Sequence, residues 1–145
     1  MCIRDSTDPL YADAMTEVYQ KRIYNLETRS DENDFAELFK NKDYEAALTL
    51  AETQFNQVVD VKKWKWQERQ GFCLWELGEK KKAIAVFHEL EKNKFLLPQK
   101  NPALWYLALT YAQVGKLTQS ESLLKRIVAI PKHDYQEAAK ELLRK

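Results

Sequence analysis

The sequence is poor in the residues on which β-proteins, disulfide frameworks and metal sites depend. Its 145 residues include three glycines, four prolines, two cysteines and two histidines. So few turn-forming residues argue against a protein of many strands, and two cysteines can form one bridge at most. The histidines, His88 and His133, are too few and too far apart in the sequence for a zinc site, which takes several ligands. We expect no bound metal or cofactor.

Long apolar runs and an excess of one charge are also missing. The longest apolar stretches, such as residues 103–109, are much shorter than the roughly 18 residues of a membrane-spanning helix. The chain has 23 Lys and Arg residues against 22 Asp and Glu residues, which is a formal net charge of +1. Such a balance provides no long-range field for nucleic acid or acidic lipid. We expect no nucleic-acid binding and no direct membrane insertion.

What the chain does contain is apolar residues at helical spacing. Hydrophobic residues make up 45% of the sequence, which argues against wholesale disorder. They recur at steps of three and four residues, and prolines and glycines stand near the ends of several of these segments. A polar break at Ser30–Asn33 separates the first two segments. The spacing predicts an all-α protein with eight helices and no strand, over residues 10–26, 35–39, 44–55, 64–77, 80–94, 103–114, 117–130 and 135–143.

The chain is predicted to form one domain with a short N-terminal extension. We interpret Met1–Ser6 as a non-native scar, because it lacks the long apolar stretch of a signal peptide and resembles a translated library adapter. Residues 7–30 are assigned to an N-terminal helix or linker. Residues 31–145 are assigned to a repeat domain that ends in a C-terminal capping helix.

A helix–turn–helix unit recurs three times, at offsets of 36 and 37 residues. In the second helix of each unit, a small residue lets two antiparallel helices approach, and the residue four positions later fills the space opposite. Ala83 and Ala108 are predicted to be inaccessible to solvent, because each is expected to lie where two helices touch. The spaced pairs are Ala47 with Ala51, Ala83 with Phe87, and Ser120 with Leu124, and the turns ahead of them lie at Lys42, Gly78 and Gly115.

This pattern resembles the tetratricopeptide-repeat family, whose signature is W-x2-L-G-x2-Y followed by A-x3-F and P. The third unit matches best, and the likeness extends over residues 31–131. The resemblance implies a right-handed α-solenoid of about three antiparallel helix pairs, with flanking N- and C-terminal helices. The matching positions are Leu104, Leu107, Ala108, Tyr111, Ser120, Leu124 and Pro131 in the third unit, Gly71, Leu74, Ala83 and Phe87 in the second, and Leu38, Ala47 and Ala51 in the first.

In that family the leading helices of the units line a concave groove that binds peptides. The resemblance therefore implies an aromatic groove in which Trp75 and Trp105 are exposed. Family members that clamp a C-terminal carboxylate use Lys and Asn on this stripe, whereas this chain has Glu32 and Glu68 there. The implied partner is a protein or peptide segment that is apolar or mildly basic. The implied partner-binding residues are Phe39, Glu68, Phe72, Trp75, Trp105 and Leu109. The alternative is that these aromatic residues pack between the units, because Trp and Phe are mostly buried residues.

Two functions fit these features. One is a non-catalytic protein–protein interaction module that holds a partner segment in the groove. The other is a structural or self-associating repeat fragment of a larger membrane-tethered bacterial protein, to whose extracytoplasmic repeat domains the general layout is similar. The sequence leaves the location open between the cytoplasm and, for a fragment of a membrane-tethered protein, the periplasm. The two functions differ in whether the groove is open or is filled by residues 10–26.

Two further residue clusters are weighed and set aside. Cys73 and His88 fall on neighbouring helices, but no oxyanion donor or Gly-rich elbow accompanies them, so a packed cysteine is favoured over a nucleophile. The segment Lys62–Trp66 interleaves basic and aromatic residues as single-strand binders do. Acidic residues interspersed nearby and the balanced charge favour a solvated helix start instead. We expect no catalytic residues and no enzyme activity.

Overall fold

The protein is built from α-helices, without strands, over residues 9–24 and 30–145, which are the residues that the computed structural model describes. This confirms the prediction of an all-α protein with eight helices. Helix α1 continues directly into a π-helical segment, η1, and short 3₁₀ turns, η2 and η3, precede α4 and α6. The bounds are α1 (Pro9–Tyr19), η1 (Gln20–Tyr24), α2 (Ser30–Lys40), α3 (Tyr44–Gln57), η2 (Asp60–Lys62), α4 (Lys63–Glu76), α5 (Lys80–Glu91), η3 (Pro98–Lys100), α6 (Ala103–Gln113), α7 (Leu117–Ala129) and α8 (Gln136–Arg144).

The start of α2 differs from the prediction. The sequence predicts a break at Ser30–Asn33, yet α2 begins at Ser30. Ser, Asp and Asn favour helix N-termini as well as turns, and negative charge near a helix start is stabilised by the helix dipole. Residues 1–8 and 25–29 lie outside the described part. The assignment of Met1–Ser6 as a scar and the end of the predicted helix 10–26 therefore stay predictions.

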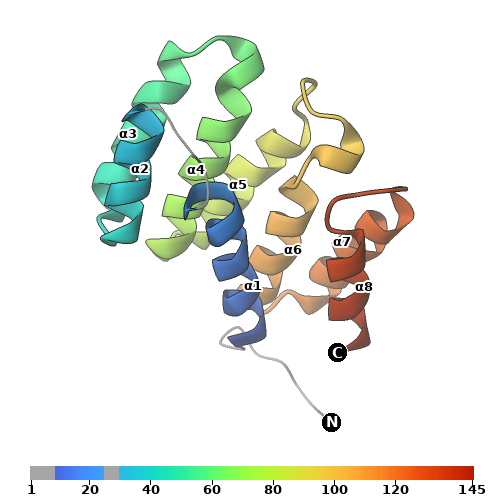
Figure 1. Ribbon diagram of the computed structural model, residues 1–145. Helices are drawn as coiled ribbons and strands as arrows, with labels where there is room; N and C mark the ends of the chain where they lie inside the picture. Colours follow the sequence, from blue (N-terminus) through green and yellow to red (C-terminus); the bar gives the residue numbers. More distant parts are fainter. Residues whose placement is uncertain (1–8, 25–29) are drawn as a thin grey trace.

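Successive helices from α2 to α8 pack against one another. Phe87 of α5 lies beside Gly71 of α4 and beside Tyr106 of α6, with ring centroids 5.2 Å apart in the second pair. Across α6 and α7, Ser120 Oγ donates a hydrogen bond to the carbonyl of Ala108 at 2.8 Å. In each of these pairs, the two residues lie at similar sequence distances before and after the turn that joins their helices. The neighbouring helices therefore run antiparallel. Figure 1 shows the helices following one another from α2 to α8, with α1 in front of α4 and α6.

Three turns share one hydrogen-bonded geometry. Lys42, Gly78 and Gly115 have positive φ angles of 63°, 81° and 81°. The N–H groups of Gly78 and the next residue donate to the carbonyls of Trp75 (3.2 Å) and Leu74 (2.9 Å), and the same pair of bonds recurs at the other two turns. This is the Schellman motif. It requires a positive φ angle, which glycine adopts without a steric penalty. The predicted turn positions are confirmed.

The small residues of the repeat lie where helices touch. Ala83 and Ala108 are fully buried, which confirms the prediction. Gly71 approaches α5 even more closely, because a Cβ atom at this position would lie 2.2 Å from Cε1 of Phe87. Phe87 is itself buried and packs against Tyr106. The phenylalanine ring therefore fills the space that a side chain at position 71 would need.

Gly71→Ala is expected to destabilise the protein although alanine is the better helix former. The added methyl overpacks the contact with Phe87 and should cost about 1 to 3 kcal/mol, of which the helix propensity of alanine offsets about 1 kcal/mol. Urea unfolding measures the net loss. Combining Gly71→Ala with Phe87→Leu should recover part of it. A free energy of unfolding that stays equal or rises in Gly71→Ala alone would contradict the close contact.

Buried His133 holds the connector between α7 and α8. Its Nε2 lies 3.1 Å from the carbonyl oxygen of Asn101, and its Nδ1 accepts the backbone N–H of Tyr135 at 3.0 Å. The second bond requires an unprotonated Nδ1, so the ring is neutral and donates from Nε2. Burial lowers the pKa of His133 below its ordinary value of 6.5, against smaller opposing effects of Asn101 and Asp134. The connector is therefore built around an uncharged imidazole.

The stability of the protein should fall at mildly acidic pH because of His133. Its pKa is lowered in the folded state, so the unfolded state binds the proton first as the pH decreases below about 6.5. The free energy of unfolding should be steady above about pH 7 and decrease toward about pH 5. His133→Gln keeps a donor and an acceptor without titrating, so its loss over this range should be smaller. Thermal unfolding across the range tests this, with partly exposed His88→Gln as the control. Equal pH profiles for the parent and His133→Gln would contradict it.

Candidate functional site

The six predicted partner-binding residues lie on α2, α4 and α6, and all of them are buried. None of the six is more than 6% exposed. The prediction that Trp75 and Trp105 are exposed in the free protein is therefore wrong. The N-terminal segment α1–η1 covers part of this surface, and aromatic or lysine side chains from neighbouring elements cover the rest. We use the name groove for the surface of Phe39, Glu68, Phe72 and Trp105, against which α1 and η1 lie.

Tyr19, the last residue of α1, inserts between two of the predicted residues. Its ring centroid is 4.8 Å from that of Phe39 and 5.1 Å from that of Phe72, both edge-on. Its hydroxyl donates to Glu76 Oε2 at 2.8 Å. Edge-to-face aromatic pairs of this kind add about 0.5 to 1.5 kcal/mol beyond the area that they bury. Tyr19 thus links α1 to α2 and α4 at once.

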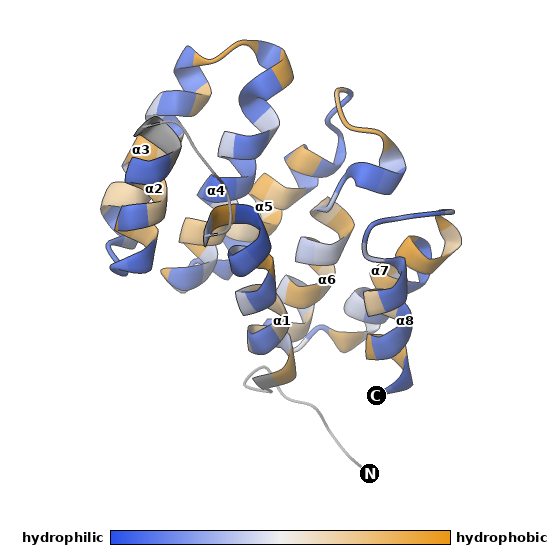
Figure 2. Cartoon of the chain, viewed as in Figure 1, coloured by the Kyte–Doolittle hydropathy of each residue, from blue (hydrophilic) through white to orange (hydrophobic). Residues whose placement is uncertain are grey.

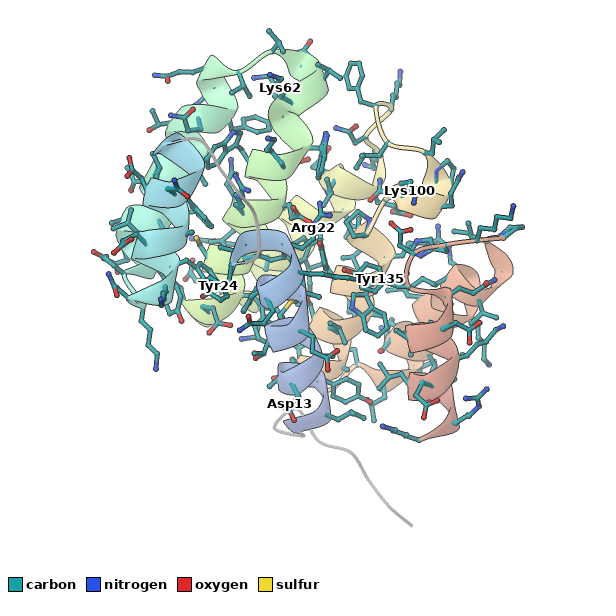
Figure 3. All side chains as sticks on the ribbon, viewed as in Figure 1. Asp13, Arg22, Tyr24, Lys62, Lys100 and Tyr135 are labelled. Carbon is teal, nitrogen blue, oxygen red and sulfur yellow. The ribbon has the colours of Figure 1, made fainter. Side chains whose placement is uncertain are left out.

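Arg22 of η1, which is labelled in Figure 3, pairs with the buried carboxylate of Glu68. The guanidinium donates from Nε to Oε1 at 3.0 Å and from Nη2 to Oε2 at 3.3 Å. The hydroxyl of Tyr106, on α6, donates to the same Oε1. The guanidinium also lies over the ring of Trp64, 5.4 Å from its centroid. Glu68 therefore has a cation and a hydroxyl donor, as a buried carboxylate requires.

The arginine and two tyrosines near Glu68 have raised pKa values. Burial raises the pKa of the Tyr106 hydroxyl well above 10.0, and the charge of Glu68 raises it further. Burial lowers the pKa of Arg22, but the neighbouring Glu68 carboxylate outweighs this and raises it above its ordinary value. Burial, followed by the charge of Glu68, raises the pKa of Tyr135 to about 12. At neutral pH the arginine stays charged and both tyrosines keep their protons.

Trp105 is covered by the residue that precedes α8. Its indole stacks on the ring of Tyr135, with ring centroids 5.2 Å apart and planes 9° from parallel. Lys21 places its ammonium 5.5 Å from the centroid of the same tyrosine. A cavity of about 340 Å³ remains between α1, α6 and the start of α8, and Val18, Lys21, Trp105 and Tyr135 are among its lining residues. The seam between α1 and the C-terminal helix is thus incompletely filled.

Trp75 and Leu109 are the two remaining predicted residues. Lys80 places its ammonium 4.4 Å from the centroid of the Trp75 ring and donates to the backbone carbonyl of Trp75 at 2.7 Å. Burial lowers the pKa of Lys80, with Glu76 acting in the opposite direction. Leu109 is fully buried. Both residues are therefore buried, and Lys80 covers one side of the Trp75 indole.

Sequence reasoning offered residues 10–26 as a possible occupant of the groove, and the structure places α1–η1 there, but it did not single out Tyr19 or Arg22. Tyr19 and Arg22 have no counterpart in the repeat, because they precede the first unit. Arg22 and Glu68 are 46 positions apart, and Tyr106 and Glu68 are 38 apart. Within that range, the pair Lys21 and Arg22 has the mildly basic chemistry expected of a segment bound in the groove.

The cysteine and histidine weighed at the sequence level lie in different environments. Cys73 is fully buried, and burial together with the charges of Glu52 and Glu76 raises the pKa of its thiol. His88 Nε2 lies 3.0 Å from the hydroxyl oxygen of Tyr111. A buried thiol with a raised pKa is a poor nucleophile. Within the described residues, no group of three or more His, Cys, Asp and Glu side chains is placed to hold a metal ion.

No protein-family model, curated protein or solved structure matches the chain. No helix within residues 9–24 and 30–145 has the length and apolar character needed to cross a membrane. The function therefore has to be inferred from the groove and the segment that fills it.

Proposed function

We propose that this protein is a non-catalytic interaction module whose groove holds an amphipathic helix, and that α1 occupies the groove until a partner replaces it. The observation that carries the proposal is the way α1–η1 is seated. Tyr19 lies between Phe39 and Phe72, and Arg22 pairs with buried Glu68. A partner helix with equivalent side chains would compete for these contacts.

The repeat supports a tetratricopeptide-like solenoid as the framework of this module. Equivalent turns at Lys42, Gly78 and Gly115, antiparallel packing of successive helices and close approach at small residues are features that a right-handed stack of helix pairs needs. In such a stack α2, α4 and α6 are the leading helices of the three units. The groove residues lie on these three helices, which is where the resemblance places the concave side.

The chemistry of the bound segment supports an apolar and mildly basic partner. Met15, Val18 and Tyr19 are buried, and the basic Lys21 and Arg22 follow them. A buried carboxylate attracts a cation and repels a peptide that ends in a carboxylate of its own. The partner helix is therefore expected to carry an aromatic residue followed three positions later by an arginine.

The alternative to an interaction module is a purely structural role for α1. The observation that supports this alternative is the extent of burial under α1. Five apolar side chains of α1–η1 are at most 5% exposed: Tyr11, Met15, Val18, Tyr19 and Ile23. Burial of each such side chain stabilises by about 1.5 to 3 kcal/mol. A segment held this firmly could be a permanent part of the domain, or could be exchanged between two copies of the chain.

A peptide with the sequence of residues 9–24 separates these functions. We would label it with a fluorophore and titrate it with the parent and with the double variant Tyr19→Ala, Arg22→Ala, in which the intramolecular segment is weakened. The seated α1 lowers the fraction of parent molecules that can bind, so the apparent affinity for the peptide should be at least about tenfold higher for the double variant. A peptide with glutamate in place of the arginine should not bind.

The double variant Asp13→Ala, Thr16→Ala changes exposed positions of α1 and serves as the matched control. It should bind the peptide as the parent does. If neither the parent nor the Tyr19→Ala, Arg22→Ala variant binds the peptide while both remain folded by circular dichroism, α1 is a permanent element. Dimers that form by sedimentation and disappear when Tyr19 and Arg22 are replaced would instead indicate exchange of α1 between copies.

A further inference from the structure

One end of the molecule is formed by the connectors α3–α4, α5–α6 and α7–α8. These connectors emerge on the same side because successive helices run antiparallel. The backbone N–H of Asp134 donates to the carbonyl of Gln99 at 3.0 Å, which ties two of the connectors together. Figure 1 shows the α3–α4 and α5–α6 connectors at the top of the molecule and the C-terminus at the bottom. We call the surface formed by residues 58–62, 92–100 and 130–134 the loop end.

The loop end carries all the large apolar side chains that are exposed in the described part of the chain. Val59, Val61, Phe95 and Leu97 are between 49% and 63% exposed. They lie on two separate connectors, which Figure 2 colours as hydrophobic. The connectors at the opposite end, around the three Schellman turns, have no side chain of this kind. Exposed apolar side chains gathered in this way indicate an interaction surface.

Lysines surround these apolar side chains. The loop end contains five lysines and two aspartates, although the net charge of the whole chain is only +1. Asp60 and Asp134 are the acidic residues on the loop end, and Asp134 pairs with Lys100 at 3.1 Å. Figure 3 shows Lys62 and Lys100 on this side of the molecule. The exposed lysines of the loop end are Lys62, Lys92, Lys94, Lys100 and Lys132.

We propose that the loop end docks onto the surface of an anionic lipid bilayer. Phe95, Leu97, Val59 and Val61 enter the headgroup region, and the lysines contact anionic headgroups. Lysines close to the membrane surface are attracted to an anionic leaflet. Apolar side chains strengthen the attachment in proportion to the apolar area that they bury. A bilayer accepts several separate protruding tips in one plane, whereas a protein partner would need a matching pocket for each connector. The attachment is peripheral and needs no membrane-spanning helix.

Co-sedimentation of the full chain with lipid vesicles tests the proposal. Vesicles of phosphatidylcholine with about 30% phosphatidylserine should bind the protein at least about tenfold more tightly than vesicles of phosphatidylcholine alone. Salt screens exposed charges, so binding should weaken steeply between about 0.1 M and 0.5 M sodium chloride. Equal binding to both vesicles, or no binding to either, would overturn the proposal.

Two double variants test the two parts of the surface. Lys62→Glu with Lys94→Glu, and Phe95→Ser with Leu97→Ser, should each weaken binding to the anionic vesicles about tenfold or more. The matched control is Lys81→Glu with Lys116→Glu, which makes the same change of net charge on exposed lysines at the opposite end. It should retain most of the binding.

All variants change exposed side chains, and circular dichroism verifies that each is folded. An equal loss in the Lys81→Glu, Lys116→Glu control would show that only net charge matters and would overturn the placement of the site. Concentration-dependent dimers of the parent that vanish in the Phe95→Ser, Leu97→Ser variant would assign the surface to a second copy of the chain, which would also overturn the proposal.

Discussion

Trp105→Ala is expected to unfold about 10 °C or more below the parent. The indole is buried and stacks on Tyr135, so its removal takes away packing between α6 and the start of α8. Truncating a buried tryptophan costs about 3 to 5 kcal/mol. In a domain of this size, 1 kcal/mol shifts the melting temperature by a few degrees. The cavity of about 340 Å³ beside Trp105 would widen, which leaves α1 with fewer partners.

Trp64→Ala provides the comparison for this experiment. Trp64 is only partly buried and lies beneath the guanidinium of Arg22. Its loss should lower the melting temperature clearly less than the loss of Trp105. If Trp105→Ala melted like the parent, the indole would be exposed in solution, as the sequence comparison with peptide-binding repeats predicts. Calorimetry and urea unfolding of the two variants decide between these outcomes.

Glu68→Ala is expected to cost about 3 kcal/mol of stability and to loosen α1. The carboxylate is the acceptor for the hydroxyl of fully buried Tyr106 and for the guanidinium of Arg22. Breaking a buried ion pair from one side costs about 3 to 5 kcal/mol. Arg22 is about one third exposed and can turn to water, so we expect the lower part of this range. Limited proteolysis should then cut within α1 sooner than in the parent.

Glu68→Gln separates the contribution of the Glu68 charge to stability from the contribution of its hydrogen bonds. The amide oxygen still accepts from Tyr106, so the loss should be clearly smaller than in Glu68→Ala. A double-mutant cycle of Arg22→Met with Glu68→Gln should yield a coupling energy of about 0.5 to 3 kcal/mol. A coupling energy near zero would show that Arg22 does not hold α1 in place through Glu68.

The residues that α2, α4 and α6 contribute to the candidate site were found from the sequence, but their environment was not. The offsets of 36 and 37 residues relate Phe39 to Trp75, Phe72 to Leu109 and Glu68 to Trp105 on successive leading helices. Whether such residues face solvent or a covering segment does not show in their spacing, because large apolar residues suit both an open groove and a core. The tertiary structure decided it through Tyr19 and Arg22, which lie outside the repeat.

The sequence by itself determined the helices, the three turns and the small residues between helices. These features depend on short-range constraints, such as the apolar period and the left-handed conformation at Gly78 and Gly115. Only the tertiary structure decided that α1 fills the groove and that exposed lysines and apolar residues gather at the loop end. The burial of α1 draws on surfaces spread over α2, α4 and α6, and a net charge of +1 says nothing about where the charges lie once the helices are packed.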